Sequence, residues 1–167
     1  LVVNNSGSAF KGSQRVVIKG WFEQVLDDPN MQTTEWGTEI YPDGLRRGLI
    51  EVTRRYHLPI YITENGIGVA EDVSQGEVQD DYRIAFMKDH IAAIKAAQEA
   101  GADVRGYFVW STFDLYSWKN GCRKRYGLVA VDFENGYTRT PKKSYRWYRD
   151  FIAGEQTGKP YQEEGQR

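Results

Sequence analysis

Residues 58–66 read LPIYITENG, an apolar stretch that ends in a carboxylate followed by a turn-forming dipeptide. The β-branched and aromatic residues of this stretch predict a buried strand over Pro59–Thr63. Glu64 is poorly suited to burial, and Asn65-Gly66 is a strong turn signal. The stretch therefore predicts a strand that delivers an acid to its carboxyl end.

Helical spacing flanks this strand on both sides. A helix is predicted over Asp43–Tyr56 from the apolar residues Leu45, Leu49, Val52 and Tyr56. A second helix is predicted to begin at Asp80 or Asp81 and to end before Gly101, with a stripe at Ile84, Met87, Ile91, Ile94 and Gln98. The run VRGYFVWSTF, residues 104–113, predicts another strand. A strand, a helix and a strand in this order predict a βαβ unit with parallel strands.

The two ends of the chain carry weaker signals. Residues 1–35 are predicted to be mostly loop, with one short strand over Arg15–Lys19. Near the other end, Leu128–Phe133 is expected to pair across a two-residue turn at Asn135-Gly136. Thr140-Pro141 is expected to cap and begin a last helix that buries Ser144, Trp147, Tyr148 and Phe151.

Composition limits the partners that the chain can have. Its 167 residues include 22 basic and 23 acidic ones, so we expect no general attraction to nucleic acid or to an anionic membrane. The single cysteine, Cys122, excludes an intrachain disulfide and favours a reducing compartment. The first ten residues lack the basic start and apolar core of a signal peptide. These features predict a cytoplasmic protein.

The predicted strand ends define a candidate site. In parallel α/β folds, catalytic groups collect at the carboxyl ends of strands. Glu64 lies at one such end, while Trp110 and the loop that holds Ser117, Lys124 and Tyr126 follow the next strand. This placement predicts an acid and an aromatic, basic loop on one rim. On position alone, Glu64 is equally well explained as a surface residue at a turn.

Four motifs, in this order, carry a resemblance to a known family: IYITENGIG, GYFVWSTFDLYSW, KRYGLVAVDF and TRTPKKSYRWY. Over Thr34–Phe151 the chain closely resembles the C-terminal part of family 1 of the glycoside hydrolases, which are retaining β-glycosidases built on a (β/α)8 barrel. The resemblance implies an α/β fold that is the C-terminal part of a TIM barrel. This part comprises about the last two β/α units, a β-hairpin and a terminal helix. Residues 1–167 are thus expected to be the C-terminal portion of a single barrel domain. We expect irregular structure over 1–35, barrel units over 36–153 and a tail over 154–167.

The resemblance assigns roles to two residues. The Glu of the ITENG motif is the family's nucleophile, so it implies that Glu64 attacks the anomeric carbon to form a covalent glycosyl-enzyme. Trp110 matches the family's aromatic platform under the sugar in the −1 subsite. Such a reaction needs no metal and no organic cofactor, and none is expected.

The loop after Trp110 departs from the plain β-glucosidases of the family, which commonly have Glu-Trp where this chain has Ser117-Trp118. Replacing an acid by Ser makes room for an anion. Lys124 offers a positive charge, and the hydroxyls of Ser117 and Tyr126 can donate hydrogen bonds to phosphate oxygens. This spacing resembles the phosphate site of the 6-phospho-β-galactosidases and 6-phospho-β-glucosidases. Trp118 favours the galactoside branch, where a Trp follows that Ser.

Other family features are different or absent. Thr38 stands where members commonly have a Trp, although Trp36 is retained, which puts the aglycone preference in doubt. The Asn-Glu-Pro motif that holds the acid/base Glu does not occur in these residues. We therefore expect a fragment of a longer enzyme or half of a split one, which needs the missing N-terminal barrel part as its partner. The chain alone is expected to be inactive.

The sequence thus predicts retaining hydrolysis of 6-phospho-β-glucosides or 6-phospho-β-galactosides, with a phosphorylated disaccharide or other β-glycoside as substrate. An ordinary β-glucosidase of the same family is the first alternative, and a non-catalytic module that binds sugar or phosphate is the second. The gluco or galacto preference, the aglycone and the formation of a homo-oligomer stay open.

Overall fold

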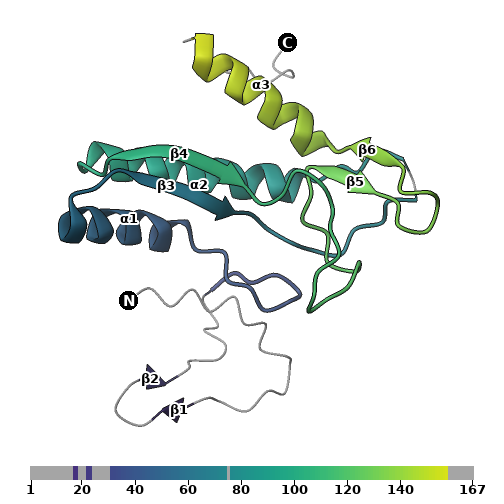
Figure 1. Ribbon diagram of the computed structural model, residues 1–167, viewed down its shortest axis with the longest axis horizontal. Coiled ribbons are helices and arrows are strands. Elements are labelled where there is room, and N and C mark those ends of the chain that lie inside the picture. Colours follow the sequence, from purple (N-terminus) through teal and green to yellow (C-terminus); the bar gives the residue numbers. More distant parts are fainter. Residues whose placement is uncertain (1–16, 19–21, 24–30, 75, 158–167) are drawn as a thin grey trace. The chain divides into compact units, whose positions relative to one another are not determined.

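A computed structural model describes residues 17–18, 22–23, 31–74 and 76–157, which are coloured in Figure 1. These residues belong to two compact units. The first consists of Leu1–Tyr61 and Asp89–Gly106, and the second consists of Ile62–Lys88 and Tyr107–Arg167. All candidate site residues belong to the second unit.

The predicted strand–helix–strand unit is present. Strand β3 (Ile60–Asn65), helix α2 (Asp81–Glu99) and strand β4 (Val104–Val109) follow one another, and the two strands are neighbours in one sheet. Backbone hydrogen bonds join Ile60 N–H to the Asp103 carbonyl over 2.8 Å and Trp110 N–H to the Asn65 carbonyl over 2.9 Å. Because the first bond lies near the start of both strands and the second near their ends, the strands are parallel, as predicted.

The boundaries of these strands differ from the predicted ones. Strand β3 continues through Asn65, two residues beyond the predicted end. Glu64 is therefore the next-to-last residue of the strand and does not follow it. Strand β4 stops at Val109, and the WSTF part of the predicted strand is loop. Asn65 belongs to β3 and Gly66 follows it without a turn, so the predicted turn at Asn65-Gly66 is wrong.

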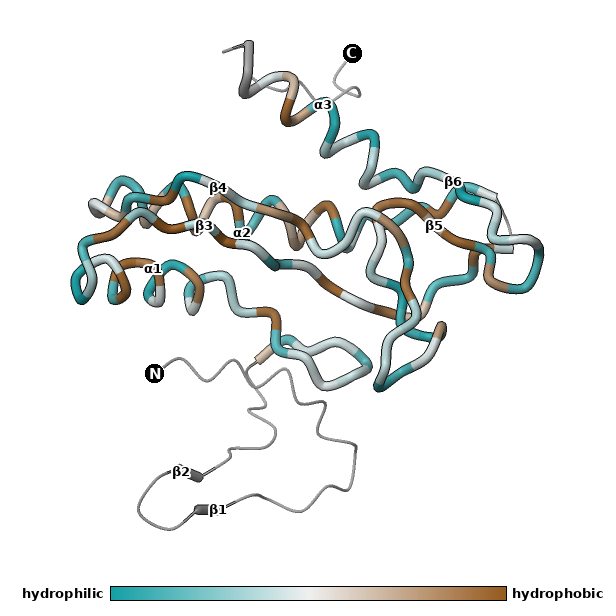
Figure 2. Tube along the Cα trace, in the orientation of Figure 1, coloured by the Kyte–Doolittle hydropathy of each residue, from teal (hydrophilic) through white to brown (hydrophobic). Residues whose placement is uncertain are grey.

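Helix α2 ends as the sequence predicted. Gly101 adopts a left-handed backbone with φ of 97°, and Ala102 N–H bonds to the Ala97 carbonyl over 2.9 Å. These features satisfy carbonyls that the helix end would leave unpaired. Three residues of the predicted stripe are buried, namely Ile84, Met87 and Ile94. Ile91 is half-buried and Gln98 is exposed, with its side-chain amide on the Val104 carbonyl. Figure 2 shows apolar and polar residues alternating along the coil of this helix.

The first unit contains the other predicted helix. Helix α1 spans Pro42–Tyr56, one residue longer than predicted, and buries Leu49. The predicted strand at Arg15–Lys19 is confirmed in short form as β1 (Val17–Ile18), which pairs with the unpredicted β2 (Phe22–Glu23). The other residues predicted as loop before position 31 lie outside the described residues.

The C-terminal hairpin has a longer connection than predicted. Strand β5 (Val129–Val131) pairs with β6 (Arg139–Pro141), and Val131 lies opposite Arg139. The turn at Asn135-Gly136 is therefore only part of the connection. Asp132 organises it, because one of its carboxylate oxygens accepts both Glu134 N–H and Asn135 N–H over 3.0 Å. A side chain that bonds its own following backbone builds such a turn without a tight two-residue geometry.

The last helix also starts later than predicted. Thr140-Pro141 lies in β6, and helix α3 spans Lys143–Thr157. Its beginning is satisfied from a distant segment, because the Asp80 carboxylate accepts Ser144 N–H over 2.8 Å and the Ser144 hydroxyl over 2.5 Å. No local pattern reports such a cap. Ser144 and Trp147 of the predicted core face are buried, while Tyr148 and Phe151 are half-buried and stack on Trp147. The helix passes Gly154, where we expected a tail.

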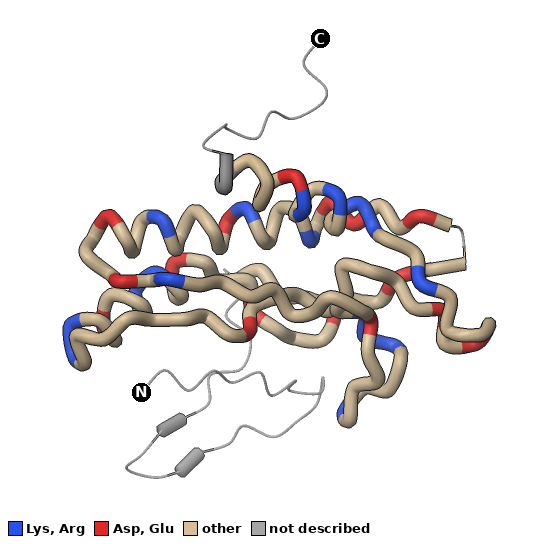
Figure 3. Tube along the Cα trace, turned by 45° about the horizontal axis from the view of Figure 1, so that its top comes forward, with Lys and Arg blue, Asp and Glu red and all other residues tan. Residues whose placement is uncertain are grey.

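A buried group of charged side chains connects several segments of the second unit. Arg83 is 1% exposed and bonds to Asp80 over 2.9 Å and to Glu71 over 2.8 Å. Lys142 is completely buried and pairs with Glu71 and, over 3.0 Å, with Asp114. Asp114 also accepts Gly127 N–H over 2.8 Å. Figure 3 shows that charges of both signs are otherwise interspersed along the helices. These buried ion pairs link three distant parts of the sequence, namely residues 71–83, Asp114 and Lys142.

The pKa of Glu71 reflects this setting. Burial by itself raises the pKa of that carboxyl, but the charges of Lys142 and Arg83 outweigh burial and hold the pKa below its ordinary value of 4.5. A carboxyl whose pKa is lowered on folding stabilises the protein fully at pH values above its pKa in the unfolded state. That stabilisation is lost as the pH falls through the pKa of the group in the folded state.

We therefore predict that Glu71→Gln lowers the free energy of unfolding by about 3–5 kcal/mol at neutral pH, because it removes one of the two carboxylates that pair with each of the buried cations Arg83 and Lys142. The variant should also lose part of the decline in stability that the wild type shows below about pH 4.5. Urea unfolding at a series of pH values measures both effects. Glu99→Gln, at an exposed site, is the matched control and should change neither. Equal acid sensitivity of Glu71→Gln and wild type would contradict this account.

Candidate active site

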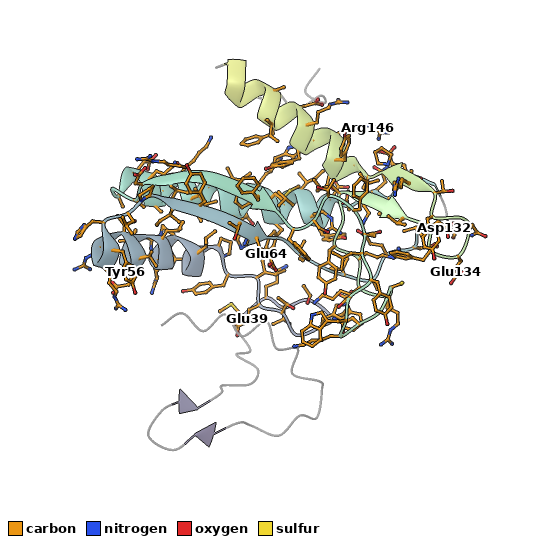
Figure 4. The ribbon with its side chains drawn as sticks, in the orientation of Figure 1. Glu39, Tyr56, Glu64, Asp132, Glu134 and Arg146 are labelled. Atoms are coloured by element: carbon orange, nitrogen blue, oxygen red, sulfur yellow. The ribbon has the colours of Figure 1, made fainter. Side chains whose placement is uncertain are left out.

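Glu64 lies near the carboxyl end of β3, where Figure 4 labels it, and its side chain is exposed. The next residue is fixed on both its backbone and its side chain. The Asn65 carbonyl accepts Trp110 N–H, and its side-chain oxygen accepts the Tyr107 hydroxyl over 2.9 Å. Burial raises the pKa of Tyr107, so this phenol stays protonated and donates. Glu64 is therefore an accessible carboxylate on a held strand end.

Trp110 follows β4 directly and is 39% exposed. The peptide bond from Trp110 to Ser111 is cis. A close backbone approach joins this residue to the end of β3, because a Cβ placed on Gly66 would lie 1.9 Å from the Trp110 carbonyl oxygen. Gly66 is thus required for contact rather than for a turn. The structure brings the predicted acid and the predicted aromatic residue to one edge of the sheet.

Ser117 is buried and organises the loop that follows. Its backbone exchanges two hydrogen bonds with Gly121, and its hydroxyl oxygen accepts Lys119 N–H over 3.3 Å and Asn120 N–H over 3.2 Å. Both side-chain bonds use the lone pairs of the oxygen, so the hydroxyl keeps its one hydrogen for donation. Trp118, in contrast, is 87% exposed, with the Lys119 ammonium 5.0 Å from its ring centroid.

Lys124 and Tyr126 form a pair. Lys124 is only 8% exposed, and its ammonium lies 5.4 Å from the centroid of the Tyr126 ring. A cation over an aromatic face is attracted by the electrons of the ring. Two of the three residues predicted to form a phosphate site are therefore in contact, and Ser117 lies in the same loop.

The backbone of Tyr126 connects this pair to the strand ends. Its carbonyl accepts Ser111 N–H over 3.1 Å and a guanidinium N–H of Arg83 over 3.0 Å. Arg83 also donates to the Ile67 carbonyl over 2.5 Å. One buried cation thus holds the segment after β3 and the segment of the pair together.

Sequence reasoning missed the residues that support the site. Arg83, Glu71, Lys142 and Asp114 were not singled out, because a charged residue on a helix or loop is usually exposed and nothing local marks it as buried. Gly68, which contacts the Lys124–Tyr126 pair, was also missed. Its signal was a glycine next to a strand end outside any turn pattern, which favours a close backbone approach.

Two properties of the described residues bear on ligands and membranes. Among residues 17–18, 22–23, 31–74 and 76–157, no group of three or more His, Cys, Asp or Glu residues could hold a metal ion. No helix within these same ranges is both long and apolar enough to cross a membrane.

Comparison with known proteins identifies the family. A strand–helix–strand unit with an acid at the carboxyl edge of its sheet is the arrangement expected of a (β/α)-barrel enzyme. The profile of glycosyl hydrolase family 1 matches residues 4–157. The chain belongs to this family.

Two curated relatives extend the comparison. The chain is 42% identical over 151 residues to a 6-phospho-beta-galactosidase of Streptococcus equi subsp. zooepidemicus, with 89% of the chain covered. It is 43% identical over 155 residues to the aryl-phospho-beta-D-glucosidase BglC of Bacillus subtilis, with 90% covered. It spans 32% of the length of each of these relatives.

Solved structures share the fold. The psychrophilic beta-glucosidase BglU of Micrococcus antarcticus matches with a TM-score of 0.71 and 38% identity, over 75% of this chain and 27% of its own. A family 1 β-glucosidase of Thermotoga maritima matches with a TM-score of 0.70 and 36% identity, over 74% of this chain and 29% of its own. The chain therefore has the fold of a portion of a TIM barrel, as predicted.

The contact between Gly66 and Trp110 provides a test of this site. We predict that Gly66→Ala in the complete enzyme lowers kcat/KM on the order of a hundredfold, because the added methyl group must push the end of β3 away from Trp110. Kinetics on p-nitrophenyl glycosides, with circular dichroism as the check on folding, measure this effect. Ala85→Ser is the control, since it adds one heavy atom to an exposed side chain of α2, and it should leave kcat/KM unchanged. A folded Gly66→Ala enzyme with full activity would contradict the proposed edge.

Proposed function

We propose that this chain is the C-terminal part of a retaining 6-phospho-β-glycosidase, which hydrolyses the β-glycosidic bond of 6-phospho-β-glucosides or 6-phospho-β-galactosides. The observations that carry the proposal are the loop with the buried Ser117 and the Lys124–Tyr126 pair, and the exposed Glu64 near the end of β3. The names of the two curated relatives, one a phospho-galactosidase and one a phospho-glucosidase, support it.

In this proposal Glu64 is the nucleophile. Its carboxylate attacks the anomeric carbon, the glycosidic bond breaks, and a carboxylic acid protonates the leaving oxygen. A water molecule then hydrolyses the glycosyl-enzyme and regenerates the carboxylate. The acid comes from the N-terminal barrel part, because these residues hold no Asn-Glu-Pro motif. The chain by itself is therefore proposed to be inactive, and no metal or organic cofactor is required.

Trp110 is proposed to lie under the sugar ring, with the phosphate directed to the loop. A phosphate that leaves water needs both a cation and hydrogen-bond donors. Lys124 supplies the charge, and the hydroxyls of Ser117 and Tyr126 donate. The exposed Trp118 is assigned to the rim of the substrate site, where an aromatic ring can cover part of the sugar.

Two alternatives make different predictions. An ordinary β-glucosidase of this family would prefer the unphosphorylated sugar, and Ser117 in place of the usual Glu speaks against it. A non-catalytic module would bind sugar or phosphate without turnover in the complete protein. The proposal also includes the cytoplasm as the compartment, because a phosphorylated sugar does not cross membranes unaided and the chain has one cysteine.

The preference for phosphorylated over plain p-nitrophenyl glycosides tests the proposal. We predict that the complete enzyme prefers the 6-phosphorylated substrate and that Ser117→Glu and Lys124→Ala both reverse or reduce this preference. Like charges at 4 Å cost about 1 kcal/mol in water and about 4 kcal/mol at an effective dielectric constant of 20. From these energies we expect kcat/KM for the phosphorylated substrate to fall roughly tens- to hundreds-fold relative to that for the plain substrate.

Lys119→Ala is the matched control for this experiment. It removes a positive charge from the same loop at an exposed position and should leave the preference unchanged. A wild-type preference for the plain sugar would favour the ordinary β-glucosidase. Binding of the phosphorylated sugar without turnover would favour the non-catalytic module.

A further inference from the structure

Gly68 contacts both members of the Lys124–Tyr126 pair. A Cβ placed on this glycine would lie 2.6 Å from one carbon of the Tyr126 ring and 2.7 Å from another, and 2.7 Å from Lys124 Cε. These three are the nearest heavy atoms, and all belong to side chains. Gly68 is not among the glycines with a left-handed backbone. The backbone there thus suits any residue, and the neighbouring side chains alone restrict the position to glycine.

The backbone that carries Gly68 has little freedom to retreat. Val69 and Arg125 exchange two hydrogen bonds, over 3.1 and 2.8 Å, immediately beside it. On the other side, the buried Arg83 donates to the Ile67 carbonyl over 2.5 Å and to the Tyr126 carbonyl over 3.0 Å. Because both flanking residues are held, a side chain at position 68 would displace the Lys124 stem and the Tyr126 ring rather than the backbone.

We propose that Gly68 is a specificity-determining residue, whose missing side chain lets Lys124 and Tyr126 pack against the backbone and so fixes their polar ends for a substrate phosphate. The inference rests on the proposed phosphate site. It adds that the positions of the Lys124 ammonium and the Tyr126 hydroxyl are set by the segment after β3 as well as by their own loop. Gly68 acts through its two neighbours and is a positioning residue.

The experiment is Gly68→Ala in the complete enzyme, with kcat and KM measured on 6-phosphorylated and plain p-nitrophenyl glycosides. The ratio of kcat/KM for phosphorylated over plain substrate should fall roughly ten- to hundredfold, since displacements of about an ångström in a positioned group have effects of this size. Ala92→Ser is the control, because it adds one heavy atom to an exposed side chain of α2, and its ratio should equal that of the wild type. A purely structural defect would lower both activities and leave the ratio unchanged, which would overturn the proposal.

A double-mutant cycle shows whether the effect passes through Lys124. In a Lys124→Ala background, Gly68→Ala should change the ratio much less than it does in the wild type, because contacting residues are not additive. Full additivity would contradict the mechanism. Should Gly68→Ala alone fail to fold, the same change in a Lys124→Ala/Tyr126→Ala background removes the three nearest contacts. Recovery of folded protein there supports the packing, and continued failure contradicts it.

The wild-type ratio separates the two proposals. If the wild-type enzyme does not prefer the phosphorylated substrate, the proposed function fails, and the role of Gly68 fails with it. If the wild type prefers the phosphorylated substrate and Gly68→Ala retains that preference in full, the proposed function stands and the inference about Gly68 alone is wrong.

Discussion

Arg83 is a charged side chain with almost no exposure to solvent, and the site depends on how its charge is satisfied. The carboxylates of Glu71 and Asp80 balance the guanidinium, and the carbonyls of Ile67 and Tyr126 accept two of its other hydrogens. A buried cation without such partners is costly, so movement of either carbonyl is opposed by the loss of a charge-assisted bond. The segments after β3 and before β5 therefore keep a fixed separation.

This fixed separation lets glycines set the positions of functional groups. Gly66 brings the end of β3 against the Trp110 carbonyl, and Gly68 accepts the Lys124 stem and the Tyr126 ring. Since neither glycine needs an unusual backbone, both are explained by proximity alone. An acid, an aromatic side chain and a cation are then held by the same backbone contacts. Groups held in advance of substrate binding lose little free energy to reorganisation, which is what a glycosidase site requires.

Local patterns predicted what local physics determines. The spacing of apolar residues predicted α1 and α2 to within one residue, and the left-handed Gly101 ended α2 as expected. The start of α3 could not be predicted, because its cap is Asp80, which is more than sixty residues away along the chain. Glu64 was predicted from the ITENG motif at a strand end, and Lys124 from its spacing to Ser117 and Tyr126 in a loop. Arg83 and Gly68 were not, since burial of a charge and closeness of a ring are tertiary facts.

The central claim is that Glu64, at the end of β3, is the nucleophile of a phospho-glycosidase. Trapping with dinitrophenyl 2-deoxy-2-fluoro-β-glycosides tests it most directly, in 6-phosphorylated and plain forms and in both the gluco and galacto series. After proteolysis, mass spectrometry should find the fluorosugar phosphate on the LPIYITENG peptide at Glu64, and no label on that peptide in Glu64→Gln. The phosphorylated reagent should label faster than the plain one. A label on another carboxylate, or faster labelling by the plain reagent, would contradict the account.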